Sequence, residues 1–301
     1  MVKSQSRVVV IVAILANVLV TLTKFAAGFW TGSSAMLSEG VHSLVDTGNE
    51  ALLLYGQYRA AKPADDDHPL GYGRELYFWS FIVALLIFAV GSGLSLYEGV
   101  TQIVHPEPIR YPLVNFGVIA AAVLFDGYSW TVALRSFRQS KGKLGWLAAV
   151  HRSKDPPNFM VLFEDSADLI GLGLAFTGNL ASVILGSPIF DGIASVGIGI
   201  LLGIVALILA RETKRLLIGE QADAHLTDAI LATTLSDGAA ASARINFSMQ
   251  LAPDDVVVGL VIVLADHVDR EAIGSAVERL QYAIAARHPE VNKVVIGIEH
   301  G

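Results

Sequence analysis

The stretches SAMLSEGVHSLVDTGNEALLLYG at 34–56 and NFMVLFEDSADLIGLGLAFTGNL at 158–180 decide how this chain folds. Each is apolar enough to cross a bilayer, and each carries two ionisable residues four positions apart, His42 with Asp46 and Glu164 with Asp168. Residues at this spacing lie one above the other on a helix face. Inserting one charged side chain at membrane depth costs about 2.5 to 3.5 kcal/mol of free energy. Four such side chains therefore imply a partner that they share. A divalent cation between the two helices is the simplest such partner.

Composition places the chain among integral membrane proteins. Its 301 residues are 53% hydrophobic and only 16% charged, against about 25% charged in soluble domains, and the mean hydropathy is +0.55. About 20 apolar residues are needed to cross the hydrocarbon core of a bilayer. We expect six spanning helices, at 8–30, 34–58, 76–104, 114–137, 159–185 and 190–213.

Lysine and arginine predict the orientation of these spans. They gather before the first span, around the second and fourth connections, and after the sixth span, whereas the odd-numbered connections hold only Arg110. Cytoplasmic loops carry the excess of positive charge, so both termini are expected in the cytoplasm. Lys24 lies in the first span near its outer end, and we expect its side chain to reach along the helix to the interface.

The end of the chain differs in character, because charge rises there and no apolar run could span. We therefore divide the chain into a transmembrane transport domain, 1–215, and a cytoplasmic C-terminal domain, 216–301. The pattern in the second domain predicts a helix, two strands, a helix and a strand. We expect them at 224–236, 244–251, 256–266, from Asp269 as N-cap to Arg287, and at NKVVIGIE (292–299). This order suits a small open-faced α/β sandwich.

Composition also excludes several classes of function. The chain has no cysteine, so any metal site must use nitrogen and oxygen donors. A net charge of -7, without a basic stripe interleaved with aromatic residues, argues against nucleic acid as a partner. GIGILLG at 197–203 has the small-residue spacing of packed helices rather than of a nucleotide loop, which disfavours an ATP-driven pump. We expect no permanently bound cofactor.

Several separated motifs, in order, resemble the cation diffusion facilitator family of divalent-metal exporters. They are SSAMLSEGVHSLVDTGNE at 33–50, KPADDDHPLGYGRE at 62–75, FEDSADLIG at 163–171 and FDGIASVGIGILLG at 190–203. The tract RSKDPPNFMVLFEDSADL at 152–169 is most similar to the branch that contains zinc transporter nine. The resemblance covers residues 8 to 220. It implies a homodimer in the membrane, six spans per protomer, a metallochaperone-like cytoplasmic domain and alternating access driven by proton antiport.

The resemblance also assigns a transport site, whose four donors match positions here. They are His42, Asp46, Glu164 and Asp168. Glu164 stands where the commoner family pattern has histidine, and three carboxylates with one imidazole favour harder cations relative to zinc. In the loop, Asp65 and His68 match two donors of a second family site, but Tyr72 occupies the place of the third. That second site is therefore expected to be weak or absent.

Other acidic residues near the four donors have two interpretations. Glu39 and Asp165 could bind the metal or hold its ligands, although a hydrogen-bonded partner within the bundle is the more frequent role. Asp126 fits a proton relay and a tie to a neighbouring helix equally well. Glu50, one turn beyond Asp46, is expected near a cytoplasmic vestibule, where it would steer cations. The four donors themselves could instead form a structural ion pair.

The sequence therefore predicts a secondary active exporter of divalent metal ions and not an enzyme. Zinc is the first choice of metal, with manganese, iron and cobalt as further candidates. Metal leaves the cytoplasm in exchange for protons, because imidazole and carboxylate ligands must release protons to bind metal. A bacterial inner membrane is the expected location. The alternatives are a membrane-embedded metalloenzyme, which would need a three-ligand site with an open position, and a metal sensor that does not transport.

Overall fold

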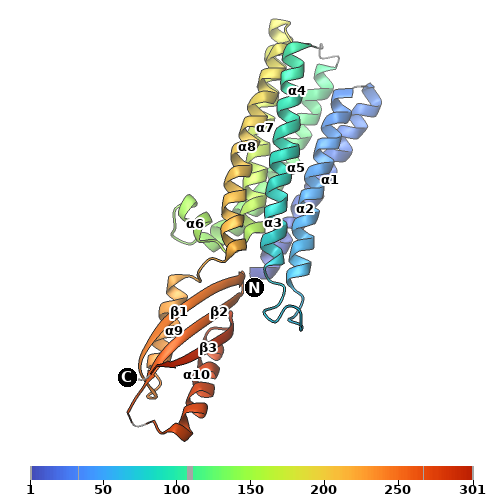
Figure 1. Ribbon diagram of the computed structural model, residues 1–301. Helices are drawn as coiled ribbons and strands as arrows, with labels where there is room; N and C mark the ends of the chain where they lie inside the picture. Colours follow the sequence, from blue (N-terminus) through green and yellow to red (C-terminus); the bar gives the residue numbers. More distant parts are fainter. Residues whose placement is uncertain (1, 33, 107–110, 267, 300–301) are drawn as a thin grey trace.

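The computed structural model describes residues 2–32, 34–106, 111–266 and 268–299. Long helices lie side by side in a bundle, and a small α/β unit is attached to one end of it (Figure 1). We call this end of the bundle the tail end and the opposite one the far end. A helical region followed by a C-terminal α/β unit is the fold class that the sequence predicts.

The helices of the bundle agree closely with the apolar stretches. Their bounds are α1 (Val2–Thr31), α2 (Ser34–Ala60), α3 (Glu75–Leu86), the π-helical turn η1 (Ile87–Ser92), α4 (Gly93–Val104), α5 (Pro112–Lys141), α6 (Trp146–Arg152), α7 (Pro156–Leu185) and α8 (Ile189–Ile218). The short helix α6, in the connection between α5 and α7, was not predicted. The other bounds lie within six residues of those expected.

Five helical segments in the described part of the chain are long and apolar enough to cross a membrane. They are α1, the continuous run α3–η1–α4, α5, α7 and α8. The helix α2 is less apolar because acidic residues and a histidine recur along it, although it packs against α1 and α3 within the bundle. The sixth span therefore stays a prediction.

The sequence fixes both ends of α7, the helix that carries Glu164 and Asp168. Pro156 and Pro157 occupy its first positions, where proline lacks only an N–H that no helical carbonyl would accept. Gly186 ends the helix in the left-handed conformation, with φ of 64°, which glycine adopts without strain. Both donors therefore lie in the interior of one uninterrupted helix.

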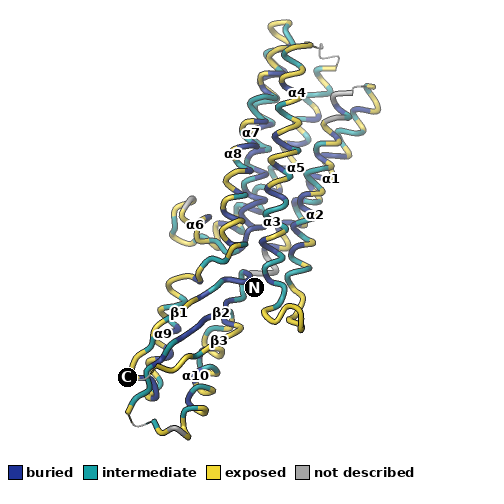
Figure 2. The backbone as a smooth tube through the Cα atoms, viewed as in Figure 1, coloured by how far each residue is buried: buried dark blue, intermediate teal, exposed yellow. Residues whose placement is uncertain are grey.

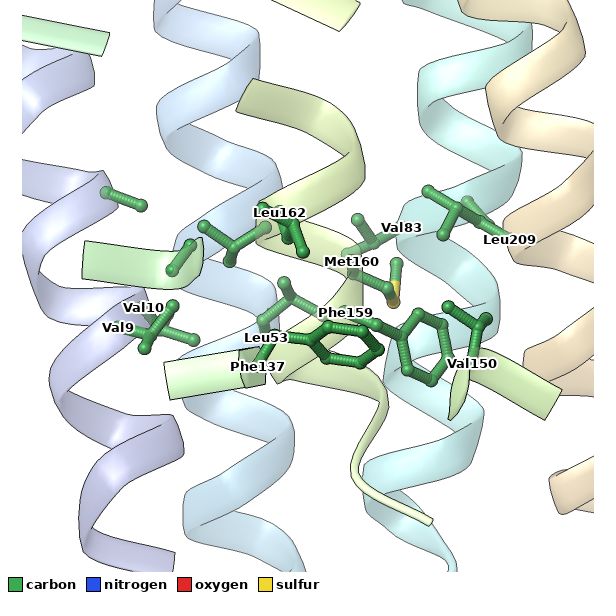
Figure 3. Packing of buried hydrophobic residues seen from close by; sticks show 14 of the residues in the cluster. Val9, Val10, Leu53, Val83, Phe137, Val150, Phe159, Met160, Leu162 and Leu209 are labelled. Carbon is green, nitrogen blue, oxygen red and sulfur yellow. The ribbon is translucent and has the colours of Figure 1, made fainter. Parts of the chain in front are cut away.

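Apolar side chains from seven of the bundle's helices, α1, α2, α3, α5, α6, α7 and α8, meet near the tail end. We call this cluster the tail-end core; its labelled members in Figure 3 are Val9, Val10, Leu53, Val83, Phe137, Val150, Phe159, Met160, Leu162 and Leu209. Leu53, Phe159 and Met160 have no exposed surface. Figure 2 shows that the buried positions follow the inner sides of the helices. The bundle is therefore tightly closed at the end next to the α/β unit.

The α/β unit consists of α9 (Ala224–Leu235), β1 (Ala240–Ala252), β2 (Asp255–Leu264), α10 (Ile273–Arg287) and β3 (Val291–Glu299). The sheet order is β1-β2-β3, with β1 antiparallel and β3 parallel to the central β2. Apolar residues of β2 pack with Ile230 of α9 and Ile284 of α10 in a second core. The predicted order of helices and strands is confirmed.

Two predicted details of the α/β unit are wrong. Strand β1 begins at Ala240 rather than at 244, because its pairing with β2 continues to Leu264. Asp269 caps no α-helix: its carbonyl accepts a hydrogen bond from the Ala272 N–H in a 3-10 turn, and α10 begins only at Ile273. The carboxylate of Asp269 thus lies too early in the chain to cap this helix.

Candidate metal centre

The helix α2 presents three ionisable residues at a constant spacing of four. His42, Asp46 and Glu50 follow one another along one face of the helix. The His42 Nε2 atom lies 3.9 Å from Asp46 Oδ2, and these side chains are 26% and 18% exposed, whereas Glu50 has no exposed surface. Exposure therefore falls along this face toward the tail end.

The helix α7 runs in the opposite direction to α2 (Figure 1) and supplies the other two predicted donors. The carboxyl of Asp46 acts electrostatically on both Glu164 and Asp168 across the bundle. Glu164 is 4% exposed, and neither of its carboxyl oxygens has a hydrogen-bond partner among the described residues. The fold thus brings the two donor pairs into one electrostatic group, with Glu164 available to a ligand.

The four donors do not enclose a finished metal site. Among the described residues, no three His, Asp or Glu side chains converge closely enough to hold a metal ion. A tetrahedral zinc site needs donors at about 2.0 to 2.2 Å from the metal. The side chains would therefore have to move toward one another to close around an ion.

Lys24 of α1 pairs with Glu39 of α2, which lies about one turn before His42 and nearer the far end. Lys24 Nζ lies 3.7 Å from Glu39 Oε2 and donates a hydrogen bond of 2.9 Å to Ser43 Oγ. The Lys24 side chain is only 13% exposed, because it packs against α2; whether it reaches the membrane interface stays a prediction. The favourable contact with Glu39 explains this packing.

Two further carboxyl groups lie between α5 and α7. Asp165 accepts a hydrogen bond of 2.7 Å from Ser129 Oγ of α5, and both residues are buried. Asp126, one turn before Ser129, is buried as well and interacts electrostatically with Lys24 and Asp46. Asp165 is therefore tied to a neighbouring helix, whereas Asp126 interacts with the cation Lys24 and with one predicted donor, Asp46.

The predicted second site lies in the loop between α2 and α3. Asp65 Oδ1 accepts the His68 backbone N–H at 2.8 Å, and Asp65 Oδ2 accepts the Tyr72 hydroxyl at 2.7 Å. These hydrogen bonds hold the pKa of Asp65 below its usual value, with the Tyr72 hydroxyl as the largest cause. The centre of the His68 ring lies 4.2 Å from that of the Tyr72 ring, with the two rings tilted by 33°. The Tyr72 hydroxyl thus donates a hydrogen bond to the Asp65 carboxylate, in place of a third metal donor.

Glu50 is the residue whose position the sequence interpretation missed. We expected it near an open vestibule, but it is fully buried and both of its carboxyl oxygens lack hydrogen-bond partners among the described residues. The spacing could have indicated this position, because Glu50 lies four residues after Asp46, as Asp46 lies four after His42. All three residues therefore share one helix face. Leu53, in the tail-end core, lies less than one turn beyond Glu50 and explains why no vestibule reaches it.

Comparison with known families decides the identity of the bundle. The model of the cation efflux transmembrane domain matches residues 10–218, which include all four predicted donors. The chain belongs to the cation efflux family. This membership confirms the resemblance found in the sequence and makes the chain a multi-pass integral membrane protein.

Three curated relatives extend this result. The chain is 38% identical to the proton-coupled zinc antiporter SLC30A9, mitochondrial, of Xenopus laevis, over 70% of this chain and 38% of that protein. It is 35% identical to metal tolerance protein C4 of Arabidopsis thaliana, over 73% of this chain and 48% of that protein. Magnetosome protein MamB of Magnetospirillum gryphiswaldense is 27% identical, over 71% of this chain and 67% of that protein.

The antiporter relatives agree with the predicted branch of the family, the one that contains zinc transporter nine. Their names and that of the family describe transport rather than catalysis. The matched region spans less than half the length of the frog and plant relatives. The likeness therefore concerns the transmembrane region above all.

Proposed function

We propose that this protein exports divalent metal ions from the cytoplasm, zinc first, in exchange for protons. The observation that carries the proposal is the pair of donor sets on antiparallel helices, His42 with Asp46 and Glu164 with Asp168, which interact electrostatically across the bundle. Family membership and the name of the proton-coupled zinc antiporter support it.

Proton coupling follows from the chemistry of the donors. An imidazole and three carboxylates bind a metal ion only after they have released their protons. Protons that arrive from the opposite side of the membrane therefore compete with the ion and displace it. The same four side chains carry metal in one direction and protons in the other.

The burial gradient supports a conformation that is open toward the far end. Side-chain exposure falls from 26% at His42 to 18% at Asp46 and to zero at Glu50, and the tail-end core closes the bundle beyond. With both termini in the cytoplasm, as the positive residues predict, the tail-end core separates the site from the cytoplasm. Alternating access then requires the helices to part at this core.

The donor set leaves a choice among metals. Zinc accepts nitrogen and oxygen donors in a tetrahedron, and the antiporter relative is named for zinc. Three carboxylates with one imidazole also suit manganese, iron and cobalt. Metal ions are the substrates in each case, and no permanently bound cofactor is part of the proposal.

The C-terminal domain, 216–301, serves as a cytoplasmic, metallochaperone-like dimerisation domain in this proposal, and 1–215 form the transport domain. The sheet supports this role, because Phe247, Gly259 and Val295 form one cross-strand row in which Phe247 is 43% and Val295 48% exposed. This apolar row faces away from α9 and α10 and suits pairing with a second copy.

The location in a bacterial inner membrane stays a prediction. The frog and mammalian relatives are named as mitochondrial, whereas the magnetosome relatives are bacterial.

A metalloenzyme and a sensor that does not transport are the alternative functions. The transport names of the relatives favour the exporter over both.

The proposal is tested with purified protein in vesicles that enclose a metal-sensitive dye. A pH gradient is imposed, and uptake of Zn²⁺, Mn²⁺, Fe²⁺, Co²⁺, Cd²⁺ and Ni²⁺ is compared. We expect gradient-dependent uptake of zinc, and of harder ions at comparable rates. Uptake that ignores the gradient would remove the antiport mechanism, and no uptake of any ion would favour the sensor or the enzyme.

A further inference from the structure

Glu50 is a buried carboxyl group for which the fold provides no counter-charge. Its side chain has no exposed surface, and neither carboxyl oxygen has a hydrogen-bond partner among the described residues. The charged groups that act on it most strongly are carboxyls as well, namely those of Glu164, Asp165 and Asp46. Burial of a polar group without a partner is costly, and burial of a charged one is more so. The Glu50 carboxyl must therefore be neutralised, either by a proton or by a bound cation.

Glu164 faces Glu50 from α7 and shares this property. It is 4% exposed, and both of its oxygens also lack hydrogen-bond partners in the described structure. Asn17 of α1 lies beside the Glu50 carboxyl, and Asn49 lies beside that of Glu164. Each of the two carboxyls thus has an amide side chain beside it, from α1 for Glu50 and from α2 for Glu164.

The buried region around these two carboxyls is distinct from the predicted transport site along the bundle axis. Glu50 lies one helical turn, about 5.4 Å, nearer the tail end than Asp46. Leu53 and Leu162 of the tail-end core lie beyond Glu50 and Glu164 on their respective helices. Lys24 pairs instead with Glu39, toward the far end. The buried region therefore lies between the four donors and the apolar closure.

We propose that Glu50 and Glu164 form a second, inner binding position for a divalent cation, which lies between the transport site and the tail-end core. The proposal rests on the proposed function only in that the ion is the transported one. Glu164 belongs to both positions, so an ion can pass from one to the other without leaving its carboxylate.

Ligand chemistry distinguishes the inner position from the transport site. The inner position offers carboxylate and amide oxygens and no imidazole, which are ligands of hard cations. It should therefore bind Mn²⁺ relatively better than the transport site does.

The test counts bound metal on the full-length protein after equilibrium dialysis against Zn²⁺ or Mn²⁺, with elemental analysis. We expect wild type to hold two tightly bound ions per chain and Glu50→Gln to hold one fewer. A count of one for wild type, or equal counts for the two proteins, would overturn the proposal. The wild-type count decides even if the variant does not fold.

Asp165→Asn is the matched control, because it removes one carboxylate at the same depth whose oxygen is already bound to Ser129. We expect it to retain the wild-type count, and Glu50→Asp to retain it at lower affinity. Loss of an ion in Asp165→Asn would show that general charge, and not coordination by Glu50, holds the second ion. That result would also overturn the proposal.

Asp168→Ala separates this proposal from the proposed function. We expect it to lose the transport-site ion and all metal flux, whereas the inner ion persists at Glu50 and Glu164. If Asp168→Ala transports normally while Glu50→Gln still loses one ion, the inner position stands and the proposed transport site is wrong. If Asp168→Ala stops flux while Glu50→Gln changes neither count nor flux, the inner position is wrong and the proposed function stands.

Discussion

Glu164 distinguishes this donor set from the commoner pattern of the family that it resembles. A histidine at this position would give two imidazoles and two carboxylates, which raise the affinity for zinc more than that for manganese. We expect Glu164→His to increase the ratio of zinc to manganese transport severalfold, measured as initial rates in vesicles. An unchanged ratio would mean that Glu164 does not contact the ion.

Asp155 joins three helices just before α7 begins. Its Oδ1 atom accepts a hydrogen bond of 3.0 Å from Ser6 Oγ of α1, and Gln57 of α2 donates to the same Ser6 oxygen. Burial raises the pKa of Asp155 to about 7, against the opposing effect of the Ser6 hydroxyl. The folded state therefore holds this proton more tightly than the unfolded state does.

This pKa predicts a pH dependence of stability with a definite sign. The folded protein binds more protons at Asp155 between about pH 4 and 7, so this residue makes the protein less stable as pH rises through that window. Asp155→Asn should gain in melting temperature over wild type by a few degrees across the window and level off above pH 7. A gain that is constant from pH 4 to 8 would contradict this.

At the scale of elements, α2 and α7 each carry one donor pair of the proposed transport site. Removing a carboxylate from either helix deletes a ligand while it lowers the cost of membrane insertion. We expect Asp46→Ala and Asp168→Ala each to reduce metal flux at least a hundredfold, with normal amounts of protein in the membrane. Near-normal flux in either variant would place the site elsewhere.

The sequence predicts these elements well where local chemistry decides them. Pro156 begins α7 and Gly186 ends it, and an apolar run of the right length lies between them. The burial of Glu50 could not be predicted in this way, because it depends on Leu53 and on side chains of α7 that meet only in the folded bundle. The direction of Lys24 likewise depends on Glu39 and Ser43, from another helix.

At the scale of the whole molecule, the open face of the sheet should hold two copies together. Phe247 and Val295 expose apolar surface there, and a domain of this size gains stability by pairing. We expect Phe247→Asp to weaken the dimer at least tenfold, measured by the concentration dependence of mass in detergent. Tyr282→Asp is the control, because Tyr282 is 77% exposed on α10; equal dimerisation of the two variants would move the interface.

Ion pairs and a backbone hydrogen bond of Glu220 attach the α/β unit to the bundle. Glu220 pairs with Lys154, at 3.1 Å, and with Arg215, at 3.0 Å, and its carbonyl accepts the Gln250 N–H of β1. Glu220 therefore ties the start of α7 and the end of α8 to the sheet. A movement of α7 during transport would reach the α/β unit through these contacts.

The exchange of metal for protons is the central claim, and simultaneous recording of both ions tests it most directly. Vesicles containing the protein enclose a zinc dye and a pH dye, and a zinc gradient is imposed without a pH gradient. We predict that zinc entry drives protons out, that both signals stop in Asp168→Ala, and that an opposing pH gradient halts zinc entry. Zinc entry without proton movement, or unchanged signals in Asp168→Ala, would contradict the account.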